Sequence, residues 1–176
     1  IQIQSESLLL DHFDTHGVIP ILDVLGKLPK ALASAIKAAS KIANGGQKGT
    51  MLIQGHSDSS DAQGQERSKL RAQTIQSILA KDEAGFVRIA SKHGSTTDFY
   101  RNLSALARCG WDCDPKQGNA VAFSEFKDEC KLRFGIKIPE SNPGPQSWKA
   151  LHRSMVWAVQ KELGEDGFRP PVWISP

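Results

Sequence analysis

An aspartate and an arginine stand where they could hold a small zwitterionic ligand. Asp58 follows an apolar run that predicts a buried strand, and Arg71 comes thirteen residues later on a predicted helix. Side chains just past the end of a strand are free to meet a ligand. A carboxylate can take an ammonium group, and a guanidinium can take a carboxylate with two hydrogen bonds. The spacing therefore indicates a clamp for one group that carries both charges, flanked by Gly55, His56 and Ser57.

Two plainer interpretations of these residues stay open. A surface aspartate and a helical arginine commonly make a weak exposed ion pair or none. A histidine at the end of a strand, such as His56, more commonly packs or hydrogen-bonds there than binds a ligand.

No arrangement typical of a catalytic site is found in the sequence. The five histidines are scattered, and none has the spacing of a metalloprotease helix. Neither a Gly-x-Ser-x-Gly turn nor a phosphate loop occurs, and nothing local supports a dyad of Cys113 with a distant histidine. We predict that the chain is not an enzyme, carries no cofactor and has no metal site.

The three cysteines leave the redox state open. Cys109 and Cys113 have a C-x3-C spacing with no second pair, which is a poor zinc signal. A Cys109 to Cys113 disulfide, a Cys113 to Cys130 disulfide and buried free thiols all remain compatible with the sequence.

In the N-terminal half, the expected strands and helices alternate. Residues 1–10 begin with alternating isoleucine and glutamine, which predicts a strand, and residues 50–54 predict a second, buried strand. Helical spacing over residues 21–42, with Pro29 in the middle, predicts a short helix, a break and a longer helix. An apolar stripe predicts a helix over residues 65–80. The order strand, helix, strand, helix indicates an α/β arrangement.

Further along the chain the sequence becomes helical. Residues 86–94 fit a strand or a helix equally well, whereas residues 98–108 predict a helix with Asp98 near its amide end.

Two later helices carry aromatic residues. One has a phenylalanine stripe closed by Gly135, and the other begins at Pro145, which suits a first helical turn. We expect Trp148 to pack against Phe123 and Phe126 in a small aromatic core. The remaining aromatic candidates could stack on sugars but more commonly pack: Trp157, Phe168 and Trp173.

The residues around the clamp resemble the peptidoglycan-binding motif of OmpA-like domains. In that family an apolar strand runs into Gly-His-Thr-Asp, and after a loop a helix carries Ser-x-x-Arg-Ala. Residues 55–58 match the first part with serine for threonine, and Ser68, Arg71 and Ala72 match the second. The resemblance implies that Asp58 meets the amine, and Arg71 the carboxylate, of diaminopimelate in the cell-wall stem peptide.

Departures from that pattern support a second interpretation. The loop between Asp58 and Arg71 is shorter than in the family, and Gly64 stands where the family has asparagine. A protein with such changes could keep the fold while having lost the ligand site.

The second half is similar to a degenerate peptidoglycan-binding helical domain of bacterial wall enzymes. That family has a Gly-Pro-x-Thr-Trp-x-Ala-Leu helix, with serine for threonine here. The matching residues are Gly144, Pro145, Ser147, Trp148, Ala150 and Leu151.

We therefore predict an α+β fold with an OmpA-like βαβα sandwich in the N-terminal half and a small helical bundle in the C-terminal half. The expected units are an OmpA-like domain at residues 1–90, a helical peptidoglycan-binding-like domain at 91–165 and a Pro/Gly-containing tail at 166–176.

The expected function is non-catalytic binding to peptidoglycan, which anchors or targets a larger bacterial protein to the cell wall. The alternative is a protein-interaction module of an envelope or secretion assembly, so the partner is peptidoglycan or a protein. The expected location is the bacterial periplasm or cell envelope, with secretion as one route to it. A net charge of +3 and a pI of 8.8 are too mild for nucleic-acid binding, and no run approaches the roughly 18 apolar residues of a membrane span.

Overall fold

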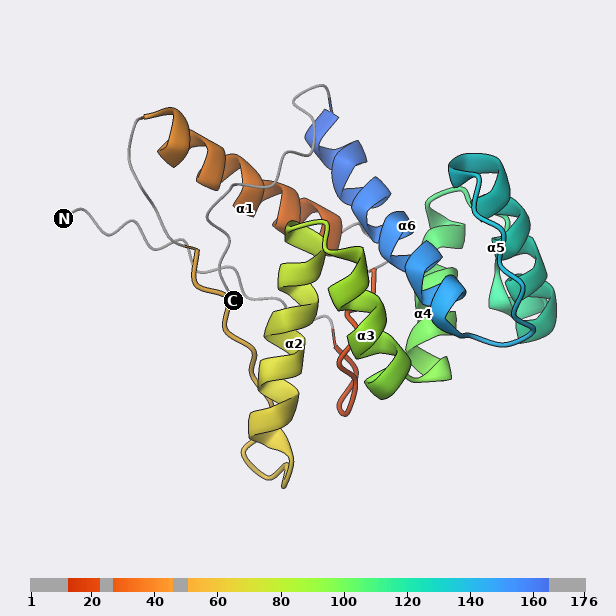
Figure 1. Cartoon of the computed structure of the whole chain (residues 1–176), viewed down its shortest axis with the longest axis horizontal. Coiled ribbons are helices and arrows are strands. Elements are labelled where there is room, and N and C mark those ends of the chain that lie inside the picture. Colours follow the sequence, from red (N-terminus) through yellow and green to blue (C-terminus); the bar gives the residue numbers. More distant parts are fainter. Residues whose placement is uncertain (1–12, 23–26, 46–50, 165–176) are drawn as a thin grey trace.

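The computed structural model describes residues 13–22, 27–45 and 51–164 (Figure 1). Over these residues every regular element is a helix and no strand occurs. The predicted strand at 1–10 and the tail at 166–176 lie outside the described residues. The elements are α1 (Lys27–Asn44), α2 (Gly64–Leu79), α3 (Glu83–His93), α4 (Thr96–Arg108), the 3-10 helix η1 (Pro115–Gln117), α5 (Asn119–Phe134) and α6 (Pro145–Leu163).

The predicted α+β fold with an OmpA-like sandwich is wrong. The buried strand expected at residues 50–54 is extended chain over its described residues 51–54, but it lies against α2 instead of pairing in a sheet (Figure 1). Met51 and Ile53 are half-buried against the core, while Leu52 is 77% exposed. Side chains of an extended segment alternate between two faces, so every second one is buried when another element covers one face. Here α2 covers that face, so alternating burial arises without a neighbouring strand.

The predicted break at Pro29 is also wrong, because α1 continues through this residue. Pro29 is the third residue of the helix as described. Amides in the first turn have no partner within the helix, so proline removes no helical hydrogen bond there.

The ambiguous segment at residues 86–94 is helical over most of its length, as part of α3. The Asp82 side chain accepts a hydrogen bond from the Gly85 amide at 2.9 Å and so caps the helix. Phe86, Ile89 and Ala90 recur at helical spacing and are buried. The cap and the stripe together favour a helix over a strand.

The helices predicted over residues 65–80 and 98–108 and from Pro145 are confirmed as α2, α4 and α6. The α5 helix ends at Gly135, which adopts the left-handed conformation at φ 67°. The predicted cap therefore forms as expected.

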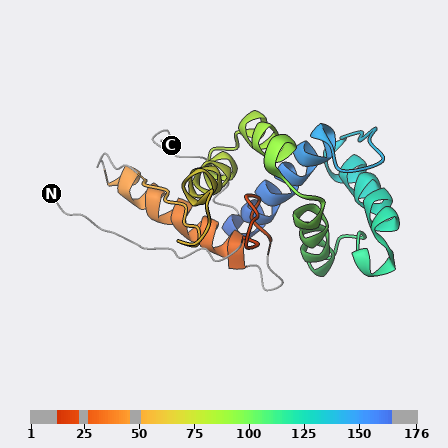
Figure 2. The same cartoon turned by 90° about the horizontal axis from the view of Figure 1, so that it is seen from below.

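The last helix, α6, is the centre of the packing. It lies against α1 and α3 and also touches α2 and α4 (Figures 1 and 2). One cluster of buried side chains extends from Val18 to Leu163 through all of these elements. The division into domains at residues 90 and 91 stays a prediction; α3 runs across that point.

Aromatic packing centres on Phe99 of α4. Its ring centroid lies 5.1 Å from that of Trp148, 5.7 Å from Phe123 and 5.5 Å from Phe126, all in edge-on orientations. Phe99 thus contacts all three aromatic residues that were expected to pack together. Trp157 packs against Trp111 at 5.5 Å, whereas Phe168 and Trp173 lie outside the described residues.

The segment at residues 13–22 has no regular structure but is anchored to α4. Asn102, which is fully buried, accepts a hydrogen bond from the Leu22 amide at 2.9 Å and donates to the Pro20 carbonyl at 3.1 Å. Side-chain bonds of this kind satisfy backbone groups that no strand partner satisfies. The segment is thereby held in place between α4 and the site described next.

Candidate functional site

Arg71 lies on α2 and binds backbone carbonyls from two other parts of the chain. Its Nε donates to the Gly17 carbonyl at 2.9 Å and its Nη1 to the His56 carbonyl at 2.7 Å. Its Nη2 donates to the carbonyls of Asp14 at 2.8 Å and Thr15 at 3.1 Å. We call Arg71 and these four carbonyls the Arg71 cluster.

The cluster has a structural consequence. The guanidinium joins the turn at residues 14–17 and the extended segment at 51–56 to α2, and its Cζ lies 5.0 Å from the centre of the Phe13 ring. Carbonyl oxygens that accept from a charged donor make strong bonds. A ligand carboxylate at Arg71 would have to displace these carbonyls.

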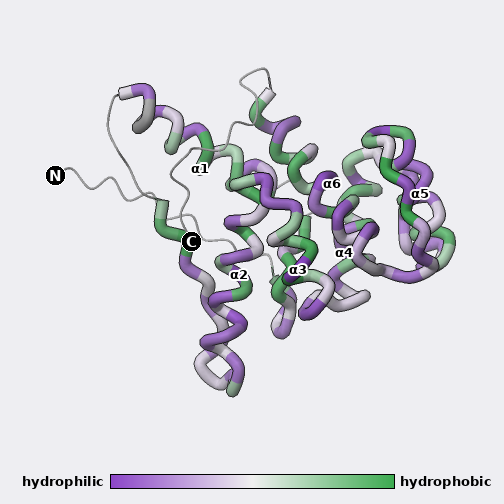
Figure 3. The backbone as a smooth tube through the Cα atoms, in the orientation of Figure 1, coloured by the Kyte–Doolittle hydropathy of each residue, from purple (hydrophilic) through white to green (hydrophobic). Residues whose placement is uncertain are grey.

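Asp58 lies in an exposed, hydrophilic loop that leads into α2 (Figure 3). Its Oδ1 accepts hydrogen bonds from the Ser60 amide at 2.9 Å and from the Ser60 hydroxyl at 2.8 Å. These bonds lower the pKa of the Asp58 carboxyl, so the group stays ionised. The structure therefore presents a negative charge to solvent at this loop.

Gly55 and Ser57 fix the loop to the start of α2. A Cβ on Gly55 would lie 1.8 Å from the Ser68 carbonyl oxygen, so only glycine fits at this close approach. The Ser57 hydroxyl donates to the Gly64 carbonyl at 2.7 Å, and the Ser68 hydroxyl donates to Ser57 at 3.1 Å. His56 contributes its carbonyl to Arg71 while its side chain is exposed.

The five residues of the predicted clamp thus lie in one region, and each of them has a packing or hydrogen-bonding role within the chain. Asp58 is the member with its carboxylate at the surface. Their role in ligand binding stays a prediction.

An ion pair that sequence reasoning missed supports the same loop. Arg67 Nε lies 2.5 Å from Asp61 Oδ2, and the Arg67 side chain also donates to the His16 carbonyl. This bond lowers the pKa of Asp61 and raises that of Arg67. A sequence signal for this pair exists, since the acid and the base flank the start of one helix.

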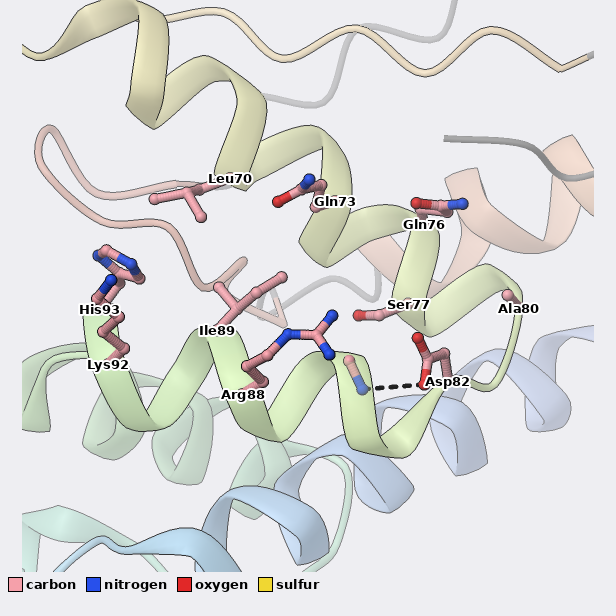
Figure 4. A pocket seen from close by; sticks show the side chains of 11 residues that line it. Leu70, Gln73, Gln76, Ser77, Ala80, Asp82, Arg88, Ile89, Lys92 and His93 are labelled. Carbon is pink, nitrogen blue, oxygen red and sulfur yellow. Dashed lines mark hydrogen bonds between the residues drawn. The ribbon is translucent and has the colours of Figure 1, made fainter.

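A pocket of about 500 Å³ lies between α2 and α3 (Figure 4). We call it the α2–α3 pocket. Figure 4 shows side chains from both helices facing it, with Asp82 near one end and His93 near the other. Its polar lining residues are Gln73, Gln76, Ser77, Asp82, Arg88, Lys92 and His93.

A second hollow, of about 660 Å³, lies on the side of α2 that faces the extended segment. Ile53 and His56 line it from the segment, and Lys69 and Ala72 line it from the helix. Gln73 and Gln76 border both hollows, so both open along α2.

A buried histidine in the core hydrogen-bonds to Ser77, one of the residues that line the α2–α3 pocket. His152 Nε2 lies 3.0 Å from the Ser77 carbonyl oxygen, and its ring packs 5.1 Å from that of Phe86. Burial lowers the pKa of His152. The imidazole is therefore neutral at pH 7, and it donates to the carbonyl through Nε2.

No group of three or more His, Cys, Asp or Glu that could hold a metal ion occurs within residues 13–22, 27–45 and 51–164. Over the same ranges, no helix has both the length and the apolar character needed to cross a membrane, in agreement with the prediction for this chain.

Comparison with known proteins finds no family, no curated protein and no solved structure that matches the chain. The OmpA-like assignment is wrong, because a βαβα domain needs a sheet and the described residues contain none. The short motif that suggested this assignment is present in the sequence. In the structure, its glycine allows a close approach to α2, and its arginine binds backbone carbonyls.

Proposed function

We propose that this chain is a non-catalytic protein-interaction module of a bacterial envelope or secretion assembly. The observation that carries this choice is the Arg71 cluster. A diaminopimelate clamp needs a guanidinium that can take a carboxylate with two hydrogen bonds. Arg71 instead donates to four backbone carbonyls, which a ligand would have to replace.

The α2–α3 pocket supports a binding role. It combines charged groups of both signs with an apolar floor, a composition that suits peptide recognition better than chemistry at a single reacting atom. A binding module needs such a surface but no nucleophile or activated base.

Peptidoglycan anchoring is the second candidate, and the Asp58 loop favours it. The Asp58 carboxylate is exposed and ionised, so it could take the amine of a stem peptide without any rearrangement. This would supply one half of the expected clamp.

Co-sedimentation with diaminopimelate-containing sacculi separates the two candidates. The wild type is compared with Asp58→Ala, and Asp128→Ala serves as the control because Asp128 is an exposed aspartate on α5. If the chain is a protein-interaction module, as we propose, the amount of wild-type protein in the pellet should be the same with and without sacculi. Pelleting that Asp58→Ala abolishes and Asp128→Ala retains would replace our proposal with wall anchoring.

A capture experiment tests the proposal directly. Immobilised full chain is incubated with a bacterial envelope extract after sacculi have been removed, and bound proteins are quantified with and without excess free chain as competitor. We expect a protein whose capture saturates and is competed away. If no captured protein is competed, the proposed function is wrong.

A further inference from the structure

The α2–α3 pocket holds two cationic side chains and a histidine that make no internal bond. Arg88 and Lys92 are one turn apart on α3 and so lie on the same face of the helix, and His93 follows. Within the part of the chain that the structure describes, none of the three makes a hydrogen bond or an ion pair. This contrasts with Arg71, whose donors are bound to carbonyls.

Two carboxamides add further donors. Gln73 and Gln76 project from α2 towards the same space, and Figure 4 shows the Arg88 guanidinium pointing between the two helices. Their side chains also make no hydrogen bond with another described residue. A planar guanidinium with nearby amide donors is suited to a carboxylate, which accepts hydrogen bonds at two oxygens.

One end of the pocket carries a negative charge. Asp82 accepts the Gly85 amide through Oδ1, which fixes its carboxylate at the start of α3. Arg88 lies on the Asp82 side of the pocket, and the apolar side chains of Leu70 and Ile89 lie between Arg88 and the end with Lys92 and His93. A ligand that fits has an anionic group and an N–H group close together, with an apolar side chain beside them.

We infer that the α2–α3 pocket binds the free carboxylate end of a peptide from a protein partner. The carboxylate lies at Arg88, a nearby peptide N–H group faces Asp82, and an apolar side chain covers Leu70 and Ile89, towards Lys92 and His93. A volume of about 500 Å³ accommodates a few residues. The inference rests on the proposed protein-interaction function and names the chemistry that it recognises.

Titration followed by amide NMR tests this inference on the full chain. The probe is acetyl-Ala-Leu-Ala with a free carboxyl terminus, and the matched control probe is the same peptide with an amidated terminus. We expect the free acid to shift the signals of α2 and α3 residues around the pocket and the amide to bind at least about tenfold more weakly, as the loss of a charge-assisted bond implies.

Two variants locate the site. Arg88→Gln removes the charge and should weaken binding of the free acid about tenfold. Arg108→Gln, at an exposed arginine on α4, should leave binding unchanged. Both arginines are exposed, so both variants should fold, which a thermal melt verifies.

The outcomes are decisive. Equal binding of acid and amide, no binding of the acid, or no effect of Arg88→Gln would overturn the inference. A diaminopimelate-containing stem tetrapeptide forms a third arm, and binding of that probe alone would overturn the assignment to a protein partner. Binding of the linear acid with no competed protein in the capture experiment would instead keep the pocket assignment and reject the proposed function.

Discussion

Arg71 and Arg88 lie on neighbouring helices and have the same side chain, yet the structure uses them in opposite ways. Arg71 faces a turn and an extended segment whose carbonyls have no helical partners, and it binds four of them. Arg88 faces a pocket and binds no described residue. The difference shows that the backbone around an arginine decides whether it holds the fold together or remains available to a ligand.

The largest effect that would test this comparison is the loss of Arg71. Arg71→Ala removes several charge-assisted bonds to backbone carbonyls, so it should lower the free energy of unfolding by about 3 kcal/mol. Chemical denaturation measures this loss. Arg88→Ala should change stability by less than about 0.5 kcal/mol.

Arg71→Lys is the sharper control. A lysine ammonium is a compact charge and cannot reach carbonyls on two separate segments as the planar guanidinium does. It should therefore recover less than half of the lost stability. Full recovery would show that charge alone, and not the geometry of the Arg71 cluster, stabilises this region.

The second prediction concerns His152, which supports the floor of the α2–α3 pocket. Burial places its folded-state pKa below the unfolded value of 6.5. As the pH falls through this range, the unfolded chain binds a proton that the folded chain does not, so stability is lost with falling pH. We expect a loss of about 1 kcal/mol between pH 7 and pH 5.5 from this group.

Denaturation at several pH values measures that slope. His152→Gln can still donate to the Ser77 carbonyl but cannot titrate, so its contribution to the slope should disappear. His93→Gln is the matched control, because His93 lines the pocket instead of the core. An unchanged slope in His152→Gln would mean that this imidazole does not control acid stability.

A third prediction concerns a buried carboxylate beside the segment that Arg71 holds. Asp98 of α4 is 1% exposed and lies beside Gly17, whose added Cβ would be 3.0 Å from Asp98 Oδ1. Neither carboxylate oxygen accepts a hydrogen bond of 3.5 Å or less from a described residue. Burial raises the pKa of Asp98, although the nearby Ser95 opposes the rise.

The direction of the pH effect follows. Above the unfolded pKa of 3.8 the unfolded chain releases the proton first, so wild-type stability falls as pH rises towards the folded pKa. Asp98→Asn removes the buried charge and should stabilise the protein by about 1 kcal/mol at pH 7, with no gain at pH 3. A destabilised Asn variant at pH 7 would show that the carboxylate has a favourable partner.

Part of this structure was predictable from the sequence for clear reasons. The helices α2, α4 and α6 carry apolar stripes. Two of them also have recognisable starts: Ser95, whose hydroxyl accepts the Asp98 amide, for α4, and Pro145 in the first turn of α6. These signals are local. They do not depend on what the helix packs against.

The remainder depended on distant contacts. The short apolar run at residues 50–54 predicted a buried strand, but nothing in it distinguishes a neighbouring strand from α2 as the covering surface. In sequence, Arg71 and Arg88 are both arginines on amphipathic helices. Which one would meet backbone carbonyls outside the helices depended on the path of residues 13–17, more than fifty positions earlier.

The smallest expected effect is at Glu83, which joins α3 to α6 by surface ion pairs. Its carboxylate lies 2.7 Å from Arg153 Nε and 3.3 Å from Lys149 Nζ. Burial acts to raise the pKa of Glu83, but the two cations outweigh it and hold the pKa below the usual 4.5. The stabilisation is therefore present above pH 4.5 and lost as the pH falls further.

Because all three side chains are about a third exposed, Glu83→Gln should cost only about 0.5 kcal/mol, and 1 M salt should remove most of that difference. The Arg71 cluster should keep most of its effect in the same salt, since its acceptors are neutral carbonyls. Denaturation of both variants at low and high salt compares the two directly. If Arg71→Ala were as salt-sensitive as Glu83→Gln, Arg71 would act as a surface charge, and the contrast with Arg88 would fail.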